Sequence, residues 1–108
     1  MTRLGRTDIA AGRTVQAEYW LAKATEAGDA GAAFELGILQ AERGAYAAAE
    51  TSMRIAADHG DTRAMNNIGV LMEARERPAE AVEWYRKAAE FGDEDATRNL
   101  ARLTGGKS

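Results

Sequence analysis

Few side chains in this 108-residue chain have the type and spacing that chemistry requires. The C-terminal run Ala101 to Ser108 contains Gly105-Gly106-Lys107-Ser108 and satisfies a loose phosphate-binding-loop pattern. That loop works because it leaves a strand and enters a helix, whose N-terminus receives the phosphate. Here the segment follows a predicted helix, so a frayed tail is the better interpretation and nucleotide binding is not expected.

The remaining titratable residues fit structural positions better than catalytic ones. His59 is the only histidine and falls at a predicted helix end, where a positive charge is favourable. Glu80 and Glu83 fall on a helix start or a solvated face. The sequence has no cysteine, which removes disulfides, thiol catalysis and Cys-ligated zinc. We therefore expect no catalytic residue, no cofactor and no metal site, and no enzymatic activity.

Charge and hydropathy narrow the classes of partner. The formal net charge is −3, from 14 basic and 17 acidic residues that are interspersed along the chain. Such a balance gives no electrostatic reason to expect nucleic acid or an anionic membrane as the main ligand. No apolar run approaches the ~20 residues of a membrane span, and the N-terminal residues lack the apolar region of a signal peptide. A cytoplasmic location is the expectation.

An internal repeat explains most of the sequence. Gly-Asp recurs at Gly28, Gly60 and Gly92, at a spacing of 32 residues (60 − 28 and 92 − 60). The same offset aligns further small and large residues: Trp20, Ser52 and Trp84; Ala17, Ala49 and Ala81; Ala24, Ala56 and Ala88; Leu4-Gly5, Leu36-Gly37, Ile68-Gly69 and Leu100-Ala101; Gly12 and Gly44. A period of this length indicates stacked units that bury their apolar faces against one another.

Each unit reads as two helices separated by a short turn. Apolar residues recur at i, i+3, i+4 and i+7, each Gly supplies a left-handed helix end, and each Asp caps the next helix. The fold predicted is an all-α, right-handed superhelical solenoid of about three helix–turn–helix repeats in one domain, 1–108. Repeats start near residues 29, 61 and 93, after a partial repeat 1–28. We expect helices over 3–11, 14–27, 30–43, 46–59, 62–75, 78–91 and 94–103, with the first and last as half-repeat caps.

Two stretches carry a resemblance to a known family. They are Ala81-Val82-Glu83-Trp84-Tyr85-Arg86-Lys87-Ala88-Ala89-Glu90-Phe91-Gly92-Asp93 and Ala64-Met65-Asn66-Asn67-Ile68-Gly69-Val70-Leu71. Together they resemble the Sel-one-like repeat, a relative of the tetratricopeptide repeat, in a short variant. The chain departs from the pattern at Ser52-Met53, at Glu76 in place of the turn glycine, and at Ala101 in place of the helix glycine. The resemblance implies an adaptor that assembles protein complexes, often in bacteria.

The resemblance also places a ligand on the concave face, which the first helix of each pair lines. The residues predicted to face a partner are Phe34, Glu35, Ile38, Arg63, Asn66, Asn67, Val70, Arg98, Asn99 and Arg102. Asn67 and Asn99 are equivalent, and the resemblance suggests that such an amide holds a peptide backbone. Arg98 and Arg102, one helical turn apart, are predicted to form a cationic pocket for a carboxylate. Trp20 and Trp84, also equivalent, are interpreted as packing residues.

Two functions from different classes follow from these observations. The first is a protein–protein interaction module that binds a peptide or protein segment on its concave face. The alternative is a structural self-assembly unit, either a homodimer or a part of a longer array, associating through end residues such as Leu4, Ile9, Leu100 and Leu103. The convex face and the helix edges also remain open as binding surfaces, and the identity of a partner is not encoded in any motif.

Overall fold

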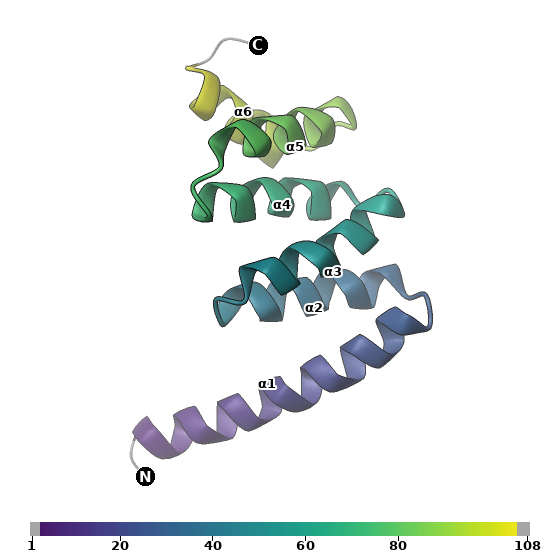
Figure 1. Ribbon diagram of the computed structural model, residues 1–108, viewed down its shortest axis with the longest axis vertical. Helices are drawn as coiled ribbons and strands as arrows, with labels where there is room; N and C mark the ends of the chain where they lie inside the picture. Colours follow the sequence, from purple (N-terminus) through teal and green to yellow (C-terminus); the bar gives the residue numbers. More distant parts are fainter. Residues whose placement is uncertain (1–2, 106–108) are drawn as a thin grey trace.

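The protein is a stack of α-helices that follow one another along a single axis. The computed structural model describes residues 3–105, with side chains from residue 14 onward. Within this range six helices follow in order: α1 (Arg3–Glu26), α2 (Ala30–Glu42), α3 (Tyr46–Asp58), α4 (Thr62–Ala74), α5 (Pro78–Glu90) and α6 (Glu94–Thr104). Figure 1 shows them stacked along the longest axis, from α1 at one end to α6 at the other.

The stack is elongated, as expected of a solenoid. Each helix packs most extensively against the helices that precede and follow it in the sequence. The radius of gyration is 15.4 Å, compared with about 13 Å for a compact domain of 100 residues. The predicted fold class, an all-α solenoid, is therefore confirmed.

The repeated Gly-Asp pair ends one helix and starts the next. Gly28, Gly60 and Gly92 all have positive φ angles, between 89° and 97°. The aspartate after each glycine then caps the following helix. For example, the Asp29 carboxylate accepts a hydrogen bond from the backbone N–H of Ala32 at 3.0 Å, and Asp61 and Asp93 repeat this arrangement. The interpretation of Gly-Asp as structural punctuation is thus confirmed.

The core consists of small residues alternating with a few large ones. Ala49, Ala56, Ala81 and Ala88 have no exposed surface, so the backbones that carry them come close together. The large side chains that fill the remaining space are Met53, Ile68, Met72 and Tyr85, all less than 2% exposed. A methyl group is therefore too large or too small at few core positions without repacking.

Two glycines let the helices of a pair touch. A Cβ atom placed on Gly37 would lie 2.9 Å from Met53 Cε, and one on Gly69 would overlap the Tyr85 ring. Both separations are shorter than real carbon–carbon contacts. Ala101 occupies the equivalent position of α6, where it is exposed and no second helix of the pair lies on it. Glycine is therefore present where a second helix packs, and alanine stands where none does.

The N-terminal region differs from the prediction. Helices were expected over 3–11 and 14–27, yet α1 runs unbroken from Arg3 to Glu26. The physical reason is that a lone glycine such as Gly12 costs a helix only about 1 kcal/mol, whereas ending the helix exposes several backbone groups. The predicted half-repeat cap over 3–11 therefore does not form a separate helix. The side chains of Leu4 and Ile9 lie outside the described residues.

The turn between α4 and α5 contains the one unusual backbone conformation of a non-glycine residue in the described chain. Glu76 has a φ of 59°, where its counterpart Gly44 has a φ of 83°. A side chain in this left-handed region costs roughly 1–2 kcal/mol. Glu76 is exposed, so its side chain gains no packing that offsets the cost.

Replacing Glu76 by glycine should therefore stabilise the protein. We expect Glu76→Gly to raise the free energy of unfolding by about 0.5–1 kcal/mol, because relief of backbone strain exceeds the added entropy of the unfolded chain. Urea denaturation followed by circular dichroism measures this. The matched control, Glu83→Gly within α5, should lower it by about 1 kcal/mol. Destabilisation by both variants would contradict the proposed strain.

Candidate functional site on the first-helix face

The first helices of the three pairs, α2, α4 and α6, form one surface, which we call the first-helix face. Residues of neighbouring first helices meet at regular offsets on it. Phe34 on α2 contacts Arg63 on α4, 29 residues later (63 − 34). Glu73 on α4 contacts Arg102 on α6, again 29 residues later (102 − 73). The two junctions, α2–α4 and α4–α6, are thus equivalent places filled with different side chains.

The α4–α6 junction is polar and its groups satisfy one another. The Asn99 amide donates to Asn66 Oδ1 at 3.0 Å. Both guanidinium NH₂ groups of Arg102 donate to the Glu73 carboxylate, at 2.6 and 3.0 Å. The buried hydroxyl of Tyr85, from α5, donates to the same carboxylate at 2.5 Å. Glu73 therefore joins three helices, and little of its hydrogen-bonding capacity remains for a ligand.

These contacts shift the protonation equilibria of both partners. Hydrogen bonds from Arg102 and then from Tyr85 lower the pKa of the Glu73 carboxyl, although partial burial acts in the opposite direction. Burial, followed by the hydrogen bond to Glu73, raises the pKa of the Tyr85 hydroxyl well above its usual range. At neutral pH the pair is therefore a carboxylate that accepts from a neutral phenol.

The α2–α4 junction, by contrast, is apolar and open. A hollow of about 320 Å³ lies there, lined by Ile38, Ala41, Glu42, Met53, Asn67, Val70 and Leu71. Val70 is 47% exposed, which is unusual for a valine between two packed helices. Within the described residues, the Asn67 amide makes no hydrogen bond. The hollow thus offers apolar walls, an available amide and a carboxylate at its rim.

A second hollow lies on the other side of α2. It has a volume of about 380 Å³ and is lined by Ala17, Leu21, Glu35, Ile38, Leu39 and Glu42. Ile38 and Glu42 line both hollows. Neither Glu35 nor Glu42 forms an ion pair in the described part of the protein. The apolar surface along α2 is therefore bordered by two carboxylates that lack a cation.

One end of this surface is closed by Arg63. Its guanidinium lies 4.2 Å from the centroid of the Phe34 ring, within the range of a cation–π contact. The same guanidinium donates to the Asp61 carboxylate at 2.8 Å, and this contact lowers the pKa of Asp61. Phe34 is thereby half-buried, and Arg63 is held by two partners.

The predicted partner-binding residues thus fall into two groups. Ile38, Asn67 and Val70 line the open hollow, and Phe34, Glu35 and Arg63 border it. Asn66, Asn99 and Arg102 lie in the self-satisfied α4–α6 junction. The predicted cationic pocket is wrong, because Arg98 pairs with Asp95 and Arg102 pairs with Glu73. Acidic neighbours at i−3 and on the adjacent first helix neutralise both cations.

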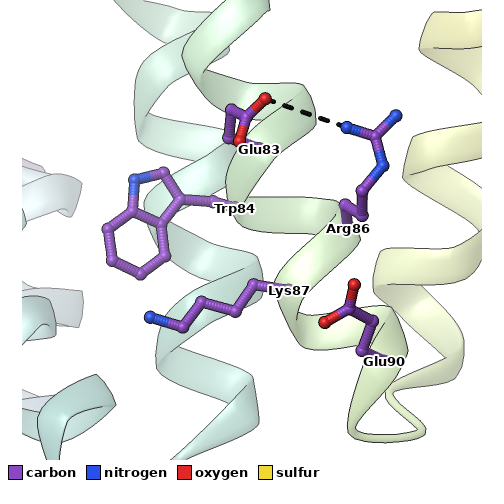
Figure 2. Close-up of a pocket in the computed structure, with 5 residues that line it drawn as sticks. All are labelled: Glu83, Trp84, Arg86, Lys87 and Glu90. Carbon is purple, nitrogen blue, oxygen red and sulfur yellow. Dashed lines mark ion pairs between the residues drawn. The ribbon is translucent and has the colours of Figure 1, made fainter.

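On the second-helix side, Trp84 of α5 lines a hollow of about 350 Å³ with Glu83, Arg86, Lys87 and Glu90. Figure 2 shows that all five come from one helix, with Arg86 directed toward α6 and Trp84 away from it. The Arg54 guanidinium and the Lys87 ammonium lie 5.3 and 5.2 Å from the Trp84 ring centroid. Trp84 is half-buried against the core, so its interpretation as a packing residue is confirmed.

Trp20, its counterpart in α1, does not pack. It is 68% exposed and stands beside Tyr19 and Val15, which are 55% and 67% exposed. The two aromatic rings contact each other edge to face, with centroids 5.1 Å apart. The packing interpretation of Trp20 is therefore wrong. The reason is that α1 runs straight, so residues 3–11 do not lie over this face of it.

Comparisons with known proteins do not identify a family. No protein-family model matches the sequence, and no curated protein is significantly similar to it. What the structure shows is a helical repeat with exposed aromatic side chains. No helix among residues 3–105 is both long enough and apolar enough to cross a membrane.

The role of Glu73 predicts a dependence of stability on pH. Because the folded-state pKa of Glu73 is lowered, its contribution is complete above the unfolded-state pKa near 4.5 and is lost as pH falls through the folded-state pKa. We expect Glu73→Gln to cost about 1 kcal/mol at pH 7 and progressively less below pH 4.5.

Urea midpoints measured from pH 7 to pH 3 test this expectation. Glu83→Gln is the matched control, because the Glu83 side chain is 77% exposed and its pairing with Arg86, at 3.8 Å, is loose. Its difference from the unmodified protein should be small at every pH. A penalty for Glu73→Gln that stays constant down to pH 3 would contradict the assigned role.

Proposed function

We propose that the protein is a protein–protein interaction module, a Sel-one-like or tetratricopeptide-like adaptor, that binds a peptide or protein segment on its first-helix face, the concave face of such solenoids. The observation that supports this proposal is the open apolar hollow between α2 and α4. The equivalent α4–α6 junction is closed by its own hydrogen bonds and ion pair. A repeat that leaves one of two equivalent junctions open and apolar has the asymmetry of a binding surface.

The chemistry of the hollow specifies what it would accept. A bulky aliphatic or aromatic side chain fits between Ile38 and Val70, where it removes apolar surface from water. The Asn67 amide can donate to and accept from a peptide backbone. Glu35 and Glu42 favour a lysine or arginine beside the apolar residue. The proposed ligand is therefore a segment with an apolar anchor flanked by basic residues.

Selection from a displayed random-peptide library tests this proposal. The peptides recovered should share an apolar anchor next to Lys or Arg. Their affinity should fall at least about tenfold in Val70→Asp, because a carboxylate under the ligand is desolvated without a partner. Asn67→Ala should weaken binding less, by removal of a hydrogen bond. Isothermal titration calorimetry measures both.

The matched control is Val15→Asp, the same change at an equally accessible valine on α1 (67% exposed). This variant should bind the peptides with unchanged affinity. Circular dichroism should show the same helical content in all variants. The proposal is contradicted if Val70→Asp and Val15→Asp reduce affinity equally, or if selection recovers no peptide that Val70→Asp disrupts.

A further inference from the structure

The exposed face of α1 is a surface that the repeat normally covers. Position 20 corresponds to position 52 in the next unit, and Ser52 is only 4% exposed, whereas Trp20 is 68% exposed. Ser52 is covered by the first helix of its own pair, to which its hydroxyl donates at Gln40 Oε1, 2.7 Å away. No first helix lies on Trp20 in the described chain. A tryptophan thus stands uncovered where the repeat buries its residue.

The missing first helix is present in the sequence as residues 3–12. In each complete pair, the glycine of the first helix touches the residue 16 positions later: Gly37 meets Met53 and Gly69 meets Tyr85. The same offset relates Gly5 to Leu21, and Leu4-Gly5 matches Leu36-Gly37. Residues 3–12 therefore carry the pattern of a first helix whose natural contact surface is α1 from residue 14 onward.

The straightness of α1 prevents this contact within one chain. Gly5 and Leu21 belong to the same unbroken helix, so they lie about 24 Å apart along its axis. Gly12, which corresponds to the turn glycine Gly44, is inside the helix and provides no reversal. The first-helix half and the second-helix half of this unit are therefore both without their partner.

We propose that two copies of the chain pair through α1 in an antiparallel exchange dimer, in which residues 3–12 of each copy cover the exposed face of α1 of the other. Antiparallel pairing brings Gly5 of one copy against Leu21 of the second copy, and the same contact forms a second time by symmetry. The midpoint of positions 5 and 21 is residue 13, so the two-fold axis passes beside Gly12. Exchange of an identical element between protomers is a known route to symmetric dimers.

The register also separates the interface residue from its exposed neighbours. Tyr19 corresponds to Thr51 and Glu83, and Val15 corresponds to Ala47 and Ala79, and these four positions are exposed in the complete units. Only Trp20 corresponds to a position that a first helix covers. The exchange dimer therefore buries Trp20 and leaves Tyr19 at its edge, although both are exposed in the single chain.

Sedimentation velocity over a concentration series tests the proposal on the full chain. We expect a species of twice 11.6 kDa. Trp20→Ser, which installs the residue found at position 52, should raise the dimer dissociation constant at least about tenfold, as expected for a central aromatic anchor. Tyr19→Ser is the matched aromatic control and should leave that constant within about threefold. A chain that stays monomeric, or equal losses in both variants, would overturn the proposal.

Engineered cysteines distinguish exchange from folding back within one chain. The sequence contains no cysteine, so the double variant Gly5→Cys/Leu21→Cys can form only the disulfide under test. On oxidation, a non-reducing gel should show a covalent dimer, whereas Gly5→Cys/Tyr19→Cys should cross-link much less. A disulfide formed within the monomer would show that residues 3–12 fold back onto their own chain, and this result would overturn the exchange.

Discussion

The structure depends on the close approach of the two helices within each pair. Gly37 and Gly69 have no Cβ, and the space this leaves is filled by Met53 and Tyr85 from the following helix. Because these two large residues are fully buried, the contact fixes how each pair is oriented. Neighbouring pairs then stack through alanines that have no exposed surface. The 32-residue period is the sequence record of this one contact.

Once the pairs are fixed, the residues between neighbouring first helices are free to differ. At the α4–α6 junction, Glu73 binds Arg102 and the Tyr85 hydroxyl, so the tyrosine that packs on Gly69 also links the core to the surface. At the α2–α4 junction the corresponding residues are Ala41 and Val70, which cannot form such links. The same geometry therefore gives a closed polar contact in one place and an open apolar hollow in the other.

The sequence was sufficient for the helices, their caps and the glycine contacts, because each depends on local residue type at a fixed spacing. It was not sufficient where a residue has alternative partners. The Arg98 and Arg102 pairings required the positions of Asp95 and Glu73 relative to α6. The straight course of α1 could not be predicted, since Gly12 is compatible with both a turn and a helix. The exposure of Trp20 follows from that single difference.

A double-mutant cycle between positions 69 and 85 tests most directly whether the close approach governs the fold. In the unmodified protein, Gly69→Ala should lower the free energy of unfolding by about 1–3 kcal/mol, because the added methyl overlaps the Tyr85 ring. In a Tyr85→Met background the flexible side chain can move aside, so the same change should cost clearly less. Equal costs in the two backgrounds, measured by urea denaturation, would contradict the account.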